Sequence, residues 1–262
     1  MKIIVCIKQV PDTTNVKIDP ETNTLIREGV ASVINPFDMY AIEEGLRIKE
    51  RMAGSEVTVV SMGPPQADIA LREAVSMGVD KAVLVSDRKI AGSDTWATSY
   101  ILSKAIQKIS DFNLILCGKQ ASDGDTAQVG PGISSWLDIP QVTYVKKIEK
   151  IEVDKAIVER MTEEGFDIVE IPLPCLFTVV KEINEPRLPS LKGKMKAKKI
   201  EIPIWGVDDL ELDEGKIGLN GSPTRVVKIF TPSAREKGMI LDGKAAESVN
   251  KIAALLEDVI IG

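Results

Sequence analysis

Short, mostly apolar segments alternate with helix-like segments along the first half of the chain, and this alternation constrains the fold most. Residues 3–7, 57–61, 82–85 and 114–117 are predicted to be buried strands. Residues 41–52, 66–77, 94–109 and 133–137 are predicted to be helical. Continuous apolar strands separated by helices are typical of a parallel sheet that is covered on both faces. We therefore expect a doubly wound α/β fold.

The pattern changes after about residue 145. Residues 148–160 and 166–171 alternate around Glu163-Glu164-Gly165, which predicts a hairpin, and residues 175–180 read as one more apolar strand. Antiparallel strands are thus expected to extend the edge of the sheet. The α/β domain is expected to span residues 1–184.

Residues 185–262 have a different composition and are expected to form a C-terminal arm. Residues 185–189 contain two prolines that end the sheet, and residues 200–240 show little core-like periodicity. An apolar stripe at helical spacing follows Asp242, and it comprises Ala245, Val249, Ile252, Ala253, Leu256 and Ile260. The arm should end in an amphipathic helix that packs either on its own domain or around a partner.

Composition excludes several classes of function. The chain has 262 residues and no histidine, so it contains neither a Ser-His-Asp nor a Cys-His catalytic set. Its net charge of −6 disfavours general nucleic-acid binding. Cys6, Cys117 and Cys175 lie apart in apolar runs, which favours buried, reduced thiols and no metal site. Because the apolar run near the N-terminus is too short for a signal peptide or membrane span, we expect a cytoplasmic protein without membrane insertion.

Four segments follow the predicted strands or begin a helix, and they should converge at one edge of the sheet, where open α/β sheets bind ligands. They are residues 6–12, 35–38, 61–65 and 118–132. In the second, Asn35 is predicted to cap a helix that begins at Pro36, with Asp38 at its third position. Taken alone, the second and third segments are also compatible with ordinary capping and turn chemistry.

The fourth segment, Gly118 to Gly132, reads GKQASDGDTAQVGPG. It contains more glycines than a short strand-to-helix turn needs, yet it matches neither a dinucleotide fingerprint nor a Walker loop. A calcium loop is disfavoured because Ser134 stands where the bidentate Glu would fall. We expect Asp123 and Asp125 to cap the helix or accept hydrogen bonds from ribose or adenine, while the amides of residues 126–130 face phosphates. The loop therefore predicts a nucleotide that is held without being hydrolysed.

These segments together resemble the β subunit of electron-transfer flavoprotein. The resemblance covers nearly the whole chain. It rests on Val5-Cys-Ile-Lys-Gln-Val10, Asn35-Pro-Phe-Asp38, Ser61-Met-Gly-Pro64, Gly118-Lys-Gln-Ala121, Pro174-Cys-Leu-Phe-Thr178, Asn184-Glu-Pro-Arg187 and Met195-Lys-Ala-Lys198.

The resemblance implies a heterodimer with an FAD-bearing α subunit, which the C-terminal arm would wrap. It implies a second nucleotide site here, holding AMP in ordinary members and FAD in electron-bifurcating ones. The implied contacts are Cys6, Asn35, Pro36, Phe37, Asp38, Met62, Asp123, Gly124, Asp125, Thr126, Ala127, Gln128, Val129, Gly130, Pro131, Gly132, Ile133 and Ser134. Residues 191–199 would be a loop that recognises partner dehydrogenases, through Leu191, Lys192, Lys194, Met195, Lys196, Lys198 and Lys199. By itself, this lysine cluster is equally compatible with a solvated charge run.

In this chain the loop is less acidic and less bulky than in ordinary members, and in this it is similar to the bifurcating group. Such a subunit would use FAD to take a hydride from NADH. Its electron acceptors would be ferredoxin or flavodoxin and, through the α subunit, a flavin-dependent dehydrogenase acting on an acyl-CoA or a 2-hydroxy acid. The alternatives are an ordinary subunit with structural AMP and a nucleotide-binding regulatory module similar to universal stress proteins. The arm and its lysines argue against the last of these.

Overall fold

The computed structural model describes residues 1–12, 17–18, 25–26, 32–109, 111–227, 238, 240–241 and 243–261. One compact unit runs from Met1 to Val226, and a second comprises the described part of Val227–Gly262. The compact unit thus extends beyond the expected boundary at residue 184. No helix within the described residues is long and apolar enough to cross a membrane.

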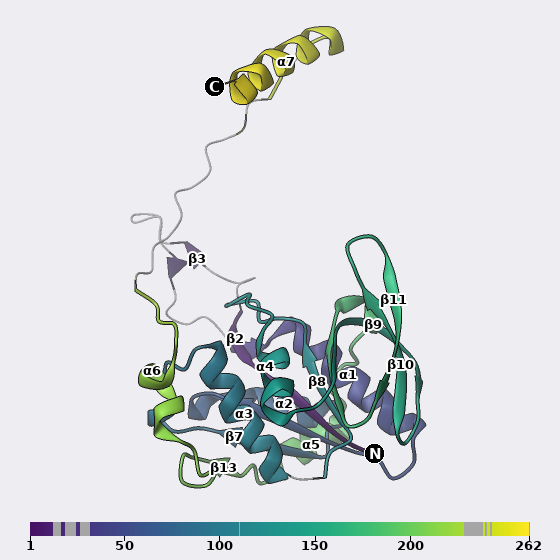
Figure 1. The fold of residues 1–262 in the computed structure, drawn as a ribbon, viewed down its shortest axis with the longest axis vertical. Helices are drawn as coiled ribbons and strands as arrows, with labels where there is room; N and C mark the ends of the chain where they lie inside the picture. Colours follow the sequence, from purple (N-terminus) through teal and green to yellow (C-terminus); the bar gives the residue numbers. More distant parts are fainter. Residues whose placement is uncertain are drawn as a thin grey trace. The chain divides into compact units, whose positions relative to one another are not determined.

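A nine-stranded, mostly parallel sheet forms the centre of the first unit (Figure 1). Its parallel strands are β1 (Lys2–Ile7), β6 (Glu56–Met62), β7 (Lys81–Val85), β8 (Leu114–Gly118), β9 (Gln141–Ile151), β12 (Cys175–Val179) and β13 (Ile204–Trp205). The strand order is β11-β10-β9-β12-β8-β1-β6-β7-β13. The four strands expected from the first half of the sequence lie side by side as predicted.

The second half differs from the expected single hairpin. Residues 148–160, read as one strand, belong to β9 and β10 (Lys155–Met161), because residues 152–154 turn the chain. The strands β10 and β11 (Phe166–Pro172) are antiparallel and joined at the predicted turn around residues 163–165. The antiparallel edge of the sheet is therefore confirmed. Two further ribbons pair β2 (Gln9–Pro11) with β5 (Ser32–Ile34) and β3 (Lys17–Ile18) with β4 (Leu25–Ile26).

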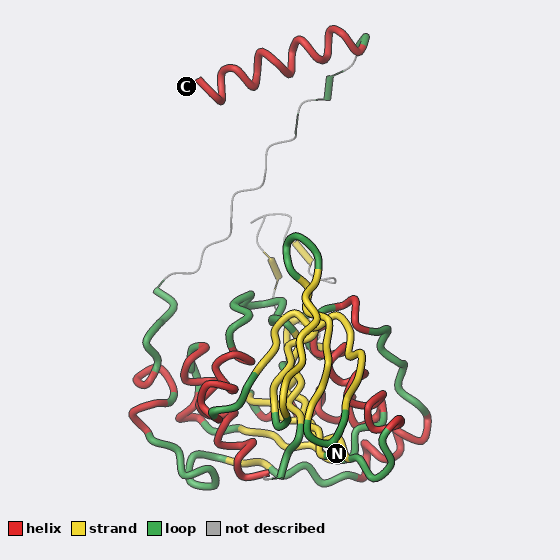
Figure 2. Tube along the Cα trace, turned by 45° about the vertical axis from the view of Figure 1, so that its right-hand side comes forward, coloured by secondary structure: helices red, strands yellow, loops and turns green. Residues whose placement is uncertain are grey.

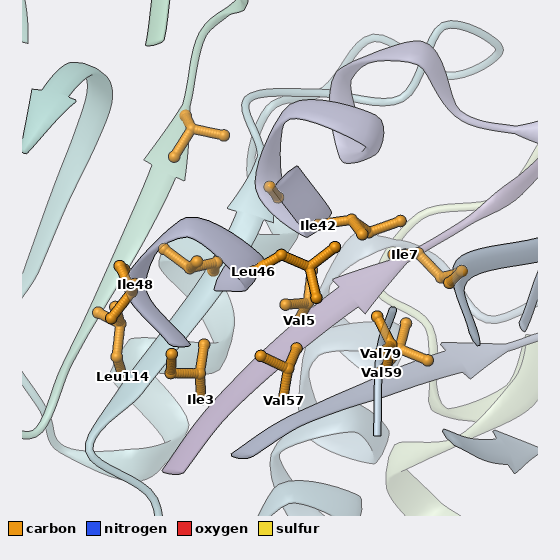
Figure 3. Close-up of a cluster of buried hydrophobic side chains, with 14 of the residues drawn as sticks. Ile3, Val5, Ile7, Ile42, Leu46, Ile48, Val57, Val59, Val79 and Leu114 are labelled. Carbon is orange, nitrogen blue, oxygen red and sulfur yellow. The ribbon is translucent and has the colours of Figure 1, made fainter. Parts of the chain in front are cut away.

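Helices cover both faces of the sheet, as the doubly wound fold predicts (Figure 2). On one face pack α1 (Pro36–Arg51), α2 (Asp68–Met77) and α5 (Leu191–Lys199). On the other face pack α3 (Thr95–Ile109) and α4 (Val129–Leu137). The side chains of Ile42 and Leu46 from α1 pack over Val5 of β1 (Figure 3). This approach is close because a Cβ at Gly45 of α1 would lie 3.3 Å from Val5 Cγ2.

Residues 191–199, expected as a loop, form the helix α5. Ser190 caps the helix through a 3.0 Å hydrogen bond from the Gly193 N–H to its side-chain oxygen. Gly193 lies so close to Ser76 that a Cβ there would overlap the Ser76 carbonyl oxygen. Tertiary packing thus stabilises a helix that is rich in lysine and contains glycine.

Residues 200–227 also contribute to the core, contrary to their weak periodicity. Val207, Leu210, Leu212 and Ile217 are buried against α3 and β7. They come from turns and loops between β13 and the short helix α6 (Gly218–Gly221), so they show no helical or strand period. The second unit contains α7 (Ala245–Ile261), which confirms the predicted helix. Asp242 and the side chain of Ile260 lie outside the described residues.

Candidate functional site: a cavity at the carboxyl edge of the sheet

A cavity of about 1140 Å³ lies where β1, β6, β7 and β8 end. Its floor includes Cys6 and Cys117, which face each other across the paired strands β1 and β8. One wall is the loop between β8 and α4, and the opposite wall is formed by residues 86–95 between β7 and α3. Residues from all four segments that were expected to converge, 6–12, 35–38, 61–65 and 118–132, line this cavity together with the segment that follows β7.

Asn35 ties three of these segments together. Its backbone N–H donates a 2.8 Å hydrogen bond to the Lys8 carbonyl oxygen, just beyond β1. Its side-chain Nδ2 donates to the Gln120 carbonyl oxygen at 2.8 Å, and its Oδ1 accepts from the Ser122 N–H at 3.1 Å. Asn35 is the N-cap residue of α1, as predicted, but its side chain makes no cap hydrogen bond to the helix. It holds the β8–α4 loop in place instead.

Asp38, the third residue of α1, is a buried carboxyl at the cavity wall. It accepts a 2.7 Å hydrogen bond from the Lys8 N–H, and a Cβ at Gly118 would overlap its Oδ1. Burial raises the pKa of Asp38 to about 7, although hydrogen bonds from Lys8, Asn35 and Gly118 act in the opposite direction. The Cys6 thiol and burial also raise the pKa of the Cys117 thiol, so that side chain is held neutral.

The backbone of the β8–α4 loop is strained. Asp125 and Ala127 adopt φ values of 52° and 54°, a left-handed conformation that is uncommon for residues other than glycine. Strain of this kind persists where the surroundings impose it, and it clusters at ligand-binding sites. Gln120 Nε2 donates to Asp125 Oδ1, and Lys8 Nζ contacts both oxygens of Asp123 at 2.6 and 2.8 Å. Both carboxylates thus have partners within the protein.

The glycines of this loop have different roles. A Cβ at Gly130 would lie 2.7 Å from Thr178 Cγ2, and one at Gly132 would lie 2.5 Å from Ser99 Oγ. These two glycines allow α4 to pack closely on neighbouring elements. A Cβ at Gly124 would meet no protein atom within 4 Å, although Gly124 lines the cavity. Of the loop's four glycines, Gly124 alone leaves its space open to a ligand.

Comparison with known proteins agrees with this architecture. Residues 22–210 match the electron transfer flavoprotein domain. The chain belongs to the electron transfer flavoprotein family. The flavoprotein β subunit of Thermoanaerobacterium thermosaccharolyticum is 55% identical over 257 residues, which cover 98% of each protein.

Two further relatives of this flavoprotein chain carry other names. CarD of the caffeyl-CoA reductase–Etf complex of Acetobacterium woodii is 51% identical over 256 residues, covering 98% of this chain and 96% of CarD. FixA of Azotobacter vinelandii is 48% identical over 247 residues, covering 90% of this chain and 86% of FixA. The resemblance to flavoprotein β subunits is thus confirmed.

The flavoprotein cavity brings together many of the residues predicted to bind nucleotide. Those that line it are Cys6, Asn35, Asp38, Met62, Gly124, Asp125, Thr126, Ala127, Gln128, Val129 and Gly130. The remaining residues, Pro36, Phe37, Asp123, Pro131, Gly132, Ile133 and Ser134, do not line it. The Phe37 ring lies 5.4 Å from Nζ of the cavity-lining Lys119, whereas Ile133 and Ser134 are buried within the body of α4.

The wall formed by residues 86–95 was not predicted from the sequence. This segment follows the predicted strand 82–85 directly, so the rule that places ligands at strand carboxyl ends applied to it as well. Lys8 lies in the predicted segment 6–12, but its pairing with Asp123 was not predicted, and neither was Val226, which lines the cavity from the end of the first unit. No local sequence pattern indicates that Val226 lies at the cavity, because tertiary contacts of residues 218–226 bring it there.

Proposed function

We propose that this chain is the β subunit of a heterodimeric electron-transfer flavoprotein and that its cavity holds FAD. The proposal rests on the volume of the cavity and on Gly124, where the lack of a side chain leaves space for a ligand. Pockets for drug-sized ligands span roughly 300–1,000 Å³, and this cavity reaches about 1140 Å³. AMP would leave much of that space empty, whereas FAD adds a second phosphate, a ribityl chain and a three-ring flavin.

The loop chemistry fits a pyrophosphate. Gln128, Val129 and Gly130 at the start of α4 line the cavity, and the positive end of the helix dipole favours negative charge there. Lys8 balances the charge of Asp123, which would otherwise repel a phosphate. The strained Asp125 and Ala127 set the direction of the intervening amides.

Asn35, Asp38 and residues 124–130 line the cavity and would hold FAD. The cofactor would supply hydride chemistry with NADH and single-electron transfer to ferredoxin or flavodoxin and, through the α-subunit FAD, to a flavin-dependent dehydrogenase. The part of this chain is to bind and orient the cofactor. The second candidate function is that of a subunit that holds AMP in the same cavity. The β8–α4 loop would contact the phosphate of AMP in the same way.

A surface on α5 and α2 is proposed to dock the dehydrogenase. Leu191 and Met195 of α5, Ile69 of α2 and Leu188 in the segment before α5 are exposed, with Leu191 at 78% and Leu188 at 88%. The exposed lysines of this helix are Lys192, Lys194, Lys196, Lys198 and Lys199, and Lys196 also donates to the carbonyl oxygens of Val79 and Asp80. An apolar centre with a basic rim suits an acidic protein partner, because the centre binds and the charges steer.

The chain that leads into α5 is firmly held. The Arg187 guanidinium contacts the buried Glu43 at 2.7 and 3.1 Å, and it contacts Glu50 at 2.5 and 3.1 Å. Its backbone N–H also donates to Glu43 at 3.1 Å. Glu43 and Glu50 belong to α1, the helix that begins beside the cavity. The docking helix is thus positioned by the core of the α/β domain.

The C-terminal helix α7 is proposed to bind the α subunit. Val249, Ile252 and Leu256 of its apolar stripe are 62%, 47% and 52% exposed. An apolar stripe of this kind usually marks an interface. Co-expression with a flavoprotein α subunit should give a 1:1 heterodimer by light scattering. A stable, flavin-loaded monomer or homodimer of this chain would contradict the proposal.

A further inference from the structure

The outer wall of the cavity is bound to a segment from the far end of the first unit. Residues 86–95 are called the wall loop, and residues 218–226 are called the strap. The wall loop and Val226 of the strap both line the cavity. The Gly218 N–H donates a 2.9 Å hydrogen bond to Ser93 Oγ, across 125 residues of sequence.

Asp94 makes the main connection between the two segments. Its Oδ2 accepts hydrogen bonds from both the backbone N–H and the hydroxyl of Thr224, each at 2.8 Å. Its own N–H donates to Ser222 Oγ at 2.8 Å, and its Oδ1 accepts from the Ala97 N–H at 3.0 Å in the first turn of α3. One aspartate therefore joins the wall loop, the strap and the helix behind them.

The backbones of the wall loop and the strap approach each other closely at two glycines. Gly92 has a φ of 77°, and a Cβ there would lie 2.7 Å from Leu219 Cγ. Gly218 has a φ of 60°, and a Cβ there would overlap the Lys89 carbonyl oxygen. Both glycines are needed for backbone conformation and for close approach. The strap therefore packs closely against the wall loop.

The connection depends on a charged carboxylate. Burial tends to raise the pKa of Asp94, but hydrogen bonds from Ala97 and Thr224 outweigh it and hold the pKa below its usual value. Hydrogen bonds to an ionised acceptor are stronger than those between neutral groups. A neutral side chain without acceptors at position 94 would lose the contacts to Thr224 and Ala97 together.

We propose that Asp94 is a positioning residue of the nucleotide site and that the strap is part of the wall that retains the nucleotide. The inference rests on the proposed nucleotide site, but it holds for either AMP or FAD. If the strap contributes to binding, the nucleotide and the strap must stabilise each other by the same factor. Loosening the strap should speed nucleotide release. Bound nucleotide should in turn slow hydrogen exchange of the strap amides.

The first test measures nucleotide release from the αβ heterodimer, with added AMP and added FAD as probes. Asp94→Ala should release nucleotide from this chain at least about ten-fold faster, since each hydrogen bond to a charged group is worth about a ten-fold step or more. Thr224→Val should cause a smaller increase because it keeps the backbone N–H. Asp213→Ala is the matched control, because Asp213 also holds a turn in this region, through Gly215, but does not line the cavity.

A second measurement separates positioning from general stability. Hydrogen exchange of the parent heterodimer with and without nucleotide should show slower exchange of the strap amides when nucleotide is bound. A purely structural role for Asp94 would lower the melting temperature of Asp94→Ala and leave strap exchange independent of nucleotide. If Asp94→Ala does not assemble, Thr224→Val and the exchange measurement on the parent decide the matter.

The outcomes are distinguishable. Equal release rates for the parent and Asp94→Ala, or strap exchange that does not respond to nucleotide, would overturn this inference alone. A parent heterodimer that binds neither AMP nor FAD in this chain would overturn the proposed function, and this inference with it.

Discussion

The Lys8 N–H donates a 2.7 Å hydrogen bond to Asp38 Oδ2 at the wall of the cavity. This contact joins the end of the first strand to the first turn of α1, and Asn35 repeats the connection through its own N–H. Hydrogen bonds between Lys8, after β1, and Asn35 and Asp38, at the start of α1, thus hold this part of the cavity wall together. Its buried carboxyl gives the site a dependence on pH.

The pH dependence of stability should carry the signature of Asp38. Its pKa is raised from 3.8 to about 7, so the unfolded chain loses this proton at a lower pH than the folded chain. The free energy of unfolding should therefore fall as pH rises between these values, by up to about 4 kcal/mol from this group, and level off above pH 7.

Asp38→Asn should remove this component. Relative to the variant, the parent heterodimer should lose about 1.4 kcal/mol of unfolding free energy per pH unit between pH 5 and pH 7. Chemical denaturation at several pH values measures the difference. Glu163→Gln, at the exposed hairpin turn, serves as the control. Parallel pH profiles for the parent and Asp38→Asn would refute this assignment.

Gly124→Glu should displace the nucleotide of this chain without unfolding it. A Cβ at Gly124 meets no protein atom within 4 Å, so the substitution adds bulk and negative charge only to the cavity. Flavin content should fall by one FAD per heterodimer, with the α-subunit FAD retained, and NADH-dependent ferredoxin reduction should be lost. Gly165→Glu is the matched control, because Gly165 in the hairpin turn is equally free of neighbours. Full flavin content in Gly124→Glu would be evidence against the loop as the binding site.

Leu191→Ala should weaken docking of the dehydrogenase. Leu191 is 78% exposed at the start of α5, so its removal deletes partner contact area and leaves the core intact. The apparent KM for the dehydrogenase should rise about ten-fold, since central apolar anchors contribute about 1–2 kcal/mol, with flavin content unchanged. Val153→Ala, 81% exposed at the turn between β9 and β10, controls for loss of a surface apolar group. An unaltered KM in Leu191→Ala would place the docking surface elsewhere.

The sequence predicted the sheet and the edge at which the candidate cavity lies, because both depend on local patterns. The apolar runs gave β1, β6, β7 and β8, and the ends of these strands meet at the cavity. The role of Asn35 was missed because a helix cap and a loop tether use the same amide group. Only the folded chain brings the Gln120 carbonyl within reach of that group.

The strap and the docking helix escaped prediction for a related reason. The contact between Asp94 and Thr224 spans 130 residues and leaves no periodic trace. The helix α5 combines lysines with a glycine, and its stability comes from the Ser190 cap and from packing on α2. Interactions between distant segments determine both features, whereas the periodicity of the strands is visible within a few residues.

The central claim is that the cavity of this chain holds FAD. The direct test is to release the bound nucleotides from the purified αβ heterodimer by denaturation and to quantify them by chromatography. Two FAD and no AMP per heterodimer are expected. One FAD and one AMP per heterodimer would contradict the claim and would establish the AMP-holding alternative.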